Sequence, residues 1–546
     1  LTQWMNQSIR KLESGFTPVA LRHHVVILGW TSRTAAIVRE LVLAEGRLQR
    51  FLRRHGARGL RIAILAEEIG VELRQELRDR LGRLWNERQT VLRTGTPLRI
   101  EHLRRVDFGN AAAILIPASD FRHGGASADA RIIKTLLSMG GHRRAAGGEL
   151  PLVVAEIFDA RKVAVARAAY PGRIELLASD SIVSRLIAQN VRSPGLSHVY
   201  GELLTNGRGN QIYAREHPQF VGTHFHSLGP CFPAAILLGV VRPSGSSFSP
   251  VLSPPANFRL AAGDRLAMLA RRHADTEPAD AEPLTGPRPE REAPRTPAPR
   301  PPRRVLVLGW SHRVPALIRE FDSYANEEFQ IDILSALPVT ERRRNVDLYE
   351  DPPRRVRVTQ LEGDYVAPAD LRRVDPGSYD NIVIVGSDWL ESGEESDART
   401  ILGSLMVRAA LGSSERTELL VELLDPENLS LFRRQTDSVI VTPIILSHML
   451  AQVALRPELR AIFDELFGPG GAEISFAPAS AYGIRDGEGD FEVLERAATA
   501  RGEIALGIRR ASERGDRDGG VVLNPHRDRV LRVDPGDEVV VLRRDA

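Results

Sequence analysis

Two glycines in this sequence follow short apolar segments, at the position where many nucleotide-binding proteins turn from a strand into a helix. The first glycine begins the segment Gly29, Trp30, Thr31, Ser32 and Arg33. Free N–H groups at the start of a helix attract anions, and an arginine at that point can add a charge-assisted hydrogen bond. These residues are therefore candidates for contact with the phosphate groups of a nucleotide.

A second turn of the same kind contains Gly309, Trp310 and Arg313. A dinucleotide fingerprint, G-x-G-x-x-G, needs its second glycine so that the pyrophosphate can approach the backbone and its third for close helix packing. In the first turn Thr31 and Thr34 occupy these later positions, which argues against ordinary NAD binding and leaves nucleotide binding open. For both arginines the alternative is a solvated first helical turn, and for both tryptophans we expect packing against neighbouring side chains.

Carboxylates follow or end several apolar segments, where hard oxygen ligands for a metal ion could gather. The candidate calcium ligands are Asp120, Glu156 and Asp180 in the first half and Asp388 and Glu422 in the second. Glu67, Ser119 and Asp120 are further candidates for contact with a nucleotide. The alternative is that each carboxylate caps a helix or pairs with an arginine, and no EF-hand spacing decides between the two interpretations.

Other kinds of site lack support in the sequence. The 14 histidines form no HExxH motif, no lysine stands in a Walker A sequence, and no G-x-S-x-G turn occurs. The single cysteine, Cys231, excludes a disulfide framework and any CxxC motif. A net charge of +3 over 546 residues gives little support to nucleic-acid binding. We therefore predict no catalytic residues and a protein that is not an enzyme.

The elements that must position these residues occur twice along the chain. The segment 24–33 recurs at 304–313, with Leu-Gly-Trp in both. Further on, Ser119-Asp120 and Asp129-Ala-Arg131 return as Ser387-Asp388 and Asp397-Ala-Arg399. A segment rich in proline, arginine and glutamate separates the copies and is typical of an extended linker. The chain is therefore predicted to contain two equivalent units.

Each unit alternates short apolar strands with helical patterns, which predicts a Rossmann-like, doubly wound parallel sheet with a cleft at the carboxyl ends of its strands. A helix-turn-helix hairpin follows, for which packing or dimerisation is favoured over DNA reading because its second helix lacks outward basic residues. A small, mainly β subdomain ends each unit. The predicted segments are 1–20 (a linker helix), 21–178 (first sheet), 179–274 (first hairpin and subdomain), 275–303 (linker), 304–435 (second sheet) and 436–546 (second hairpin and subdomain).

This arrangement resembles tandem RCK domains, the regulators of potassium conductance, and the individual blocks resemble the CASTOR/POLLUX ion-channel family more closely. The resemblance rests on Leu28-Gly29-Trp30, on the Ser-Asp and Asp-Ala-Arg blocks, and above all on residues 180–204 with Gln189 and Pro194-Gly195-Leu196. It covers nearly the whole chain except the linker. It implies the ligand-sensing part of a cation channel, with potassium as the conducted ion, and it points to Ca²⁺ as the ligand. NAD or another nucleotide stays open as an alternative ligand.

The resemblance also implies a homotetrameric ring of eight RCK domains at the cytoplasmic face of the cell membrane. The excess of arginine over lysine, with only Lys11, Lys134 and Lys162 in the chain, favours a bacterial origin. Residues 1–16 resemble the segment that joins the last pore helix to the first regulatory domain, so we expect transmembrane pore helices upstream in the same protein. No stretch of this chain approaches eighteen consecutive apolar residues, the minimum for a spanning helix. The alternatives are a soluble regulatory subunit of a Trk/Ktr-like potassium transporter and an NAD-dependent oxidoreductase.

Overall fold

A computed structural model describes most of the chain. The described residues are 15–118, 124–146, 149–204, 209–245, 247–284, 301–346, 352–390, 392–412, 416–432, 438–467, 471–483, 487–516, 518–527, 530–534 and 536–544. Three predictions fall wholly or largely outside them: the linker helix, the Ser119-Asp120 site and the central part of the interdomain linker.

The first sheet is parallel and has six strands in the order β3-β2-β1-β4-β5-β6. Its strands are β1 (Val25–Leu28), β2 (Ile62–Ala66), β3 (Thr90–Thr94), β4 (Ala113–Ile116), β5 (Leu152–Ile157) and β6 (Ile174–Ala178). Residues of β1, β2 and β4 are buried throughout, as expected of central strands covered on both faces. The strand order reverses at β1, so β1 and β4 flank the switch point where α/β proteins bind ligands.

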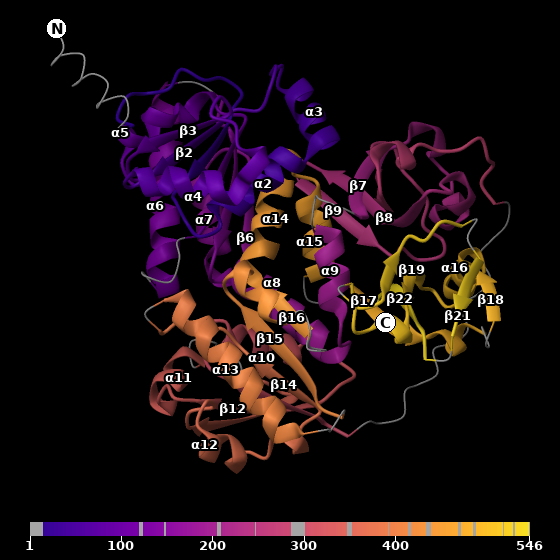
Figure 1. The fold of residues 1–546 in the computed structure, drawn as a ribbon. Helices are drawn as coiled ribbons and strands as arrows, with labels where there is room; N and C mark the ends of the chain where they lie inside the picture. The colour runs from indigo at the N-terminus through magenta and orange to yellow at the C-terminus, as the bar shows by residue number, and fades with distance from the viewer. Residues whose placement is uncertain are drawn as a thin grey trace, which may run out of the picture. The chain divides into compact units, whose positions relative to one another are not determined.

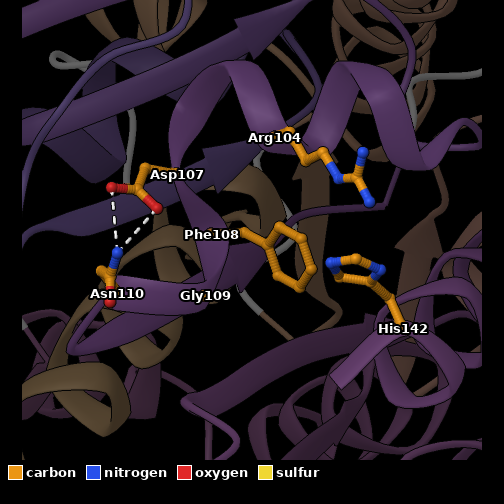
Figure 2. A pocket seen from close by; sticks show the side chains of 6 residues that line it. All are labelled: Arg104, Asp107, Phe108, Gly109, Asn110 and His142. Carbon is orange, nitrogen blue, oxygen red and sulfur yellow. Dashed lines mark hydrogen bonds between the residues drawn. The ribbon is translucent and has the colours of Figure 1, made fainter. Parts of the chain in front are cut away.

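Helices connect these strands (Figure 1). They are α2 (Thr34–Leu43), α3 (Glu45–Arg54), α4 (Val71–Leu81), α5 (Ile100–Leu103), α6 (Gly124–Ala146) and α7 (Val163–Ala169). One hydrophobic cluster joins the strands to α6 and α7 through residues such as Ile114, Leu136 and Ala166. The apolar faces of these helices therefore fix the sheet edge that carries the candidate residues.

The second sheet repeats the first, with strand order β13-β12-β11-β14-β15-β16. Its strands are β11 (Arg303–Leu308), β12 (Phe329–Ser335), β13 (Val356–Glu362), β14 (Asn381–Ile384), β15 (Glu418–Leu423) and β16 (Ser438–Val441). Its helices are α10 (Val314–Asp322), α11 (Val339–Val346), α12 (Pro368–Arg373) and α13 (Gly393–Leu411). The identical order agrees with the duplication seen in the sequence.

A helical hairpin follows each sheet. The hairpins are α8 (Ser179–Arg192) with α9 (Leu196–Leu204), and α14 (Thr442–Leu455) with α15 (Leu459–Phe467). The first turns at Gly195, whose φ of +95° favours glycine. Arg509 Nη1 donates a hydrogen bond to the carbonyl of Pro194 at 2.7 Å, so this turn is also bound from outside the hairpin.

Two four-stranded antiparallel sheets complete the chain, with orders β7-β10-β8-β9 and β17-β22-β19-β20. The first contains β7 (Gln211–Glu216), β8 (Ala235–Ser244), β9 (Ser247–Leu252) and β10 (Arg265–Ala270). The second contains β17 (Ala472–Pro478), β19 (Ile504–Arg509), β20 (Val521–Leu523) and β22 (Glu538–Arg544), with helix α16 (Phe491–Ala500) and a ribbon of β18 (Gly487–Asp490) and β21 (Val530–Val533).

The compact units of the structure differ from the two sequence copies. Unit 1 combines residues 1–180 with 443–457, whereas unit 2 combines residues 181–442 with 458–546. Helix α14 of the second copy therefore belongs to the unit that contains the first sheet, and most of α8 belongs to the unit that contains the second. In the part of the chain that the structure describes, no helix has the length and apolar character needed to span a bilayer.

Candidate functional site

In unit 1 the arginine of the glycine turn reaches across the carboxyl edge of the sheet. Arg33 stands directly before α2, and its guanidinium lies 2.6 Å from the Glu156 carboxylate on β5, with side-chain exposures of 7% and 1%. Arg33 also donates to the carbonyl of Ala118 at 2.8 Å, while the Ala118 N–H donates to Glu156 at 3.1 Å. The three residues form a closed set of contacts over the end of β4.

Unit 2 contains the equivalent pair. Arg313 lies 2.7 Å from Glu422 on β15, and both side chains are buried. Glu422 accepts hydrogen bonds from the Gly386 N–H at 3.0 Å and from the Thr442 hydroxyl at 2.7 Å. The solvated position considered for both arginines is therefore wrong, because each is drawn over the sheet edge by a buried carboxylate. Glu156 and Glu422 lie within their strands rather than beyond the strand ends.

The remaining acidic candidates have separate partners. Both carboxylate oxygens of Asp180 accept the Ala160 N–H, at 3.2 and 3.1 Å. Asp388 accepts the His312 N–H at 2.9 Å and pairs with its imidazole. Burial would raise the pKa of Asp388, but the hydrogen bonds and charge of His312 outweigh burial and hold this pKa below its ordinary value.

The described residues contain no group of three or more His, Cys, Asp or Glu side chains placed to hold a metal ion. As arranged, Glu156 and Glu422 bind arginine and backbone N–H groups and do not form a calcium cage. Asp120, a further acidic candidate in the first half of the chain, lies outside the described residues. Calcium binding thus stays a prediction from the sequence.

The two clefts differ at the strand next to the glycine turn. Glu67 follows β2 and pairs with Arg131 of α6 at 2.6 Å. In unit 2 Ser335 ends β12, and the equivalent arginine, Arg399, pairs instead with Asp364 after β13, also at 2.6 Å. Both pairs are partly exposed, so each adds little stability. The carboxylate that pairs with this arginine therefore follows the second strand, β2, in the first sheet and the third strand, β13, in the second sheet. The two sheets thus differ in charge along the carboxyl ends of their strands.

The tryptophans after the glycines also differ. Trp310 is buried, and the guanidinium of Arg342 lies 5.8 Å from its ring centroid. Arg342 is itself fully buried and donates to the carbonyl of Leu361 at 2.8 Å. Trp30 is only partly buried. Trp310 is therefore packed against neighbouring side chains, and Arg342 lies beside the second glycine turn. No sequence signal separates Arg342 from the two arginines that follow it.

The glycines of the two turns give a matched prediction. Gly29 and Gly309 have φ angles of +103° and +95°. A Cβ on Gly29 would meet nothing within 4 Å, whereas a Cβ on Gly309 would lie 3.0 Å from the carbonyl oxygen of Val385. We expect Gly29→Ala to cost about 1–2 kcal/mol through backbone strain. Gly309→Ala should cost at least about 1 kcal/mol more because of overpacking. Urea unfolding of the two variants checks this, and equal losses would contradict it.

These features define the class of fold: a chain of two sequence copies, each with a doubly wound α/β sheet, a helical hairpin and a small β subdomain, the organisation predicted for tandem RCK domains. Among solved structures, the human SLO3 gating ring has the same fold, with a TM-score of 0.67, 15% sequence identity, and coverage of 95% of this chain and 99% of that one. The predicted fold class is confirmed.

The sequence comparisons then show which channels the chain is similar to. Residues 180–285 match the family model described as Castor and Pollux, part of voltage-gated ion channel. The chain is 25% identical to the ion channel CASTOR of Lotus japonicus over 93% of its own length, and 24% identical to the probable ion channel SYM8 of Pisum sativum over 98%. The resemblance to the CASTOR/POLLUX ion channels is confirmed. The chain spans 61% of the length of each of these two relatives.

Proposed function

We propose that this chain is the ligand-sensing gating ring of a potassium-conducting cation channel. Four copies would form a ring of eight RCK-type units at the cytoplasmic face of the membrane, and ligand binding would change the ring and pull on pore helices of the same protein. The relatives named as ion channels and the fold of the SLO3 gating ring support this proposal.

The observation that carries the proposal is a pair of exposed apolar patches at equivalent positions of the two copies. The first patch consists of Leu137 on α6 and Val165 on α7. The second consists of Leu402 and Leu405 on α13 with Leu429 and Leu431 on the 3-10 turn Pro426–Phe432.

One residue of the first patch has a counterpart at the equivalent position of the second. Leu137 stands at the same distance from Asp129 as Leu405 does from Asp397. Each of these aspartates also ties its long helix to the element that carries the rest of the patch. Lys162, directly before α7, donates to Asp129 at 2.8 Å, and Asn428 of the 3-10 turn donates to Asp397 at 2.8 Å.

Exposed apolar side chains that recur on both copies fit association between like units better than scattered surface variation. The occupant we propose for each patch is the equivalent helical face of a neighbouring unit in the ring. The second patch is the larger of the two, so we expect it to contribute more to assembly.

Lysine substitutions in the patches test the assembly. Leu405→Lys with Leu431→Lys should shift the purified chain to smaller species, and Leu137→Lys with Val165→Lys should do so to a lesser degree. The matched control is Val71→Lys, because Val71 on α4 is an apolar side chain that is 82% exposed outside both patches. Sedimentation velocity gives the size distribution. A wild-type chain that stays monomeric at high concentration, or patch variants that assemble like the control, would reject the proposal.

The ligand is tested separately by calorimetric titration with CaCl₂, NAD and ADP. Calcium heat that Glu156→Ala abolishes would support a calcium site at the first sheet edge, and binding there would require Arg33 to leave Glu156. Saturable heat from a nucleotide, with none from calcium, would instead support nucleotide sensing. Absence of heat from all three would remove these ligands from the proposal while leaving the assembly test unaffected.

A further inference from the structure

The hairpin helices α8 and α14 are equivalent, but they carry different cations at one buried position. The segment that ends at Gln189 corresponds to the one that ends at Gln452, which places Arg185 opposite His448. Arg185 is almost fully buried in unit 2, where it pairs with Glu320 of α10 and lies 3.2 Å from Glu473 of β17. Because arginine stays protonated at all ordinary pH values, this contact is a permanent ion pair.

In unit 1 the same contact is made by a histidine. His448 Nε2 lies 3.1 Å from Glu40 Oε1 of α2, and the two side chains are 9% and 6% exposed. Glu40 and Glu320 are themselves equivalent, since both follow an arginine in the helix after the glycine turn. Helix α14 is thus joined to the first sheet through Glu40, the equivalent of the Glu320 that holds α8 in unit 2. The partner on α14 is a histidine, which can lose its charge, whereas the partner on α8 is an arginine. The two helices, α14 and α2, are labelled in Figure 1.

We propose that the His448–Glu40 pair is a proton-dependent latch that holds α14 on unit 1. Histidine changes its charge between about pH 5 and 8, so the pair is ionic at the acidic end of this range and a neutral hydrogen bond at the basic end. A charged hydrogen bond is roughly twice as strong as a neutral one. Attachment of α14 is therefore strongest in acid and weakens as the pH rises.

The other buried charged side chains described on these elements are Arg47 of α3 and Arg456, directly after α14. Both are guanidinium groups that keep their charge over this range. Among the described residues of 34–54 and 443–457, the buried charged or ionisable side chains are therefore Glu40, Arg47, His448 and Arg456, and His448 is the one imidazole. Helix α14 belongs to the second copy in sequence but lies in unit 1, so a change in its attachment would affect both copies.

Hydrogen exchange of α14 in the full chain tests the latch. After correction for the intrinsic pH dependence of exchange, the wild-type helix should open about five- to thirtyfold more often at about pH 8 than at about pH 5.5, which corresponds to one or two kcal/mol. His448→Arg copies the arrangement of Arg185, so its opening should be low and independent of pH. His448→Gln keeps a hydrogen bond without the charge, so its opening should be higher and also independent of pH.

Glu40→Gln provides a second variant in case arginine does not fit beside α2, because it removes the anionic partner while His448 stays intact. This variant should lose the stronger attachment of α14 in acid. The proposal would be overturned if the ratio of α14 opening at about pH 8 to opening at about pH 5.5 were the same in the wild type as in His448→Gln. The latch does not depend on ring assembly, since exchange of α14 is measured within one chain; its effect on gating rests on the proposed function.

Discussion

Replacing Glu422 with alanine is expected to lower the free energy of unfolding of unit 2 by about 3–5 kcal/mol. The substitution leaves the buried Arg313 guanidinium without its counter-charge at 2.7 Å. It also removes the acceptor used by the Gly386 N–H and the Thr442 hydroxyl. A buried charge and two buried donors that lose their partner are costly, because water cannot replace the lost oxygen atoms. Urea unfolding, with hydrogen exchange of β14 to identify unit 2, measures the loss.

Three matched variants separate the contributions. Glu422→Gln keeps an acceptor for both donors and removes only the charge, so its loss should be intermediate. Glu156→Ala should cost less than Glu422→Ala, because Arg33 retains the carbonyl of Ala118 at 2.8 Å. Glu87→Ala, which breaks an exposed pair with Arg78, should change stability by less than about 1 kcal/mol. A loss of less than about 1 kcal/mol for Glu422→Ala would mean that the pair does not hold the sheet edge together.

These buried pairs show where prediction from the sequence stops. The apolar runs of the strands and the repeated order of elements were enough to predict two doubly wound sheets, because strand burial and period are local properties. The pairing of Arg33 with Glu156 was not predictable in the same way. Several carboxylates end neighbouring strands, and periodicity does not reveal which one a flexible arginine reaches.

The pairing of His448 with Glu40 illustrates a second limit. The repeat alone places His448 opposite Arg185 and Glu40 opposite Glu320. It does not reveal that α14 packs in the unit of the first sheet, since the linker and hairpin allow each helix to stay with its own copy or cross to the other. The difference between a permanent and a titratable pair becomes visible only when the contacts are known.

The second large effect is expected for Arg185→Met, which should destabilise unit 2 by about 3–5 kcal/mol. Arg185 lies between the largely buried carboxylate of Glu320, 10% exposed, and the buried carboxylate of Glu473, which approach it from different elements. Arg192 also pairs with Glu473, and its guanidinium lies 3.9 Å from the ring centroid of Tyr324. Methionine fills much of the volume of arginine but supplies no charge, so Glu320 would be left buried and uncompensated.

A paired substitution distinguishes lost charge from lost packing. Arg185→Met combined with Glu320→Leu removes both members of one ion pair, and buried pairs replaced by apolar groups of similar volume often cost little. We therefore expect the double variant to recover part of the stability lost in Arg185→Met, with Arg192 still compensating Glu473. Arg131→Met, at the partly exposed pair with Glu67, is the control and should have a small effect. If the double variant is as unstable as the single one, packing of the long arginine side chain, rather than its charge, holds α8 in unit 2.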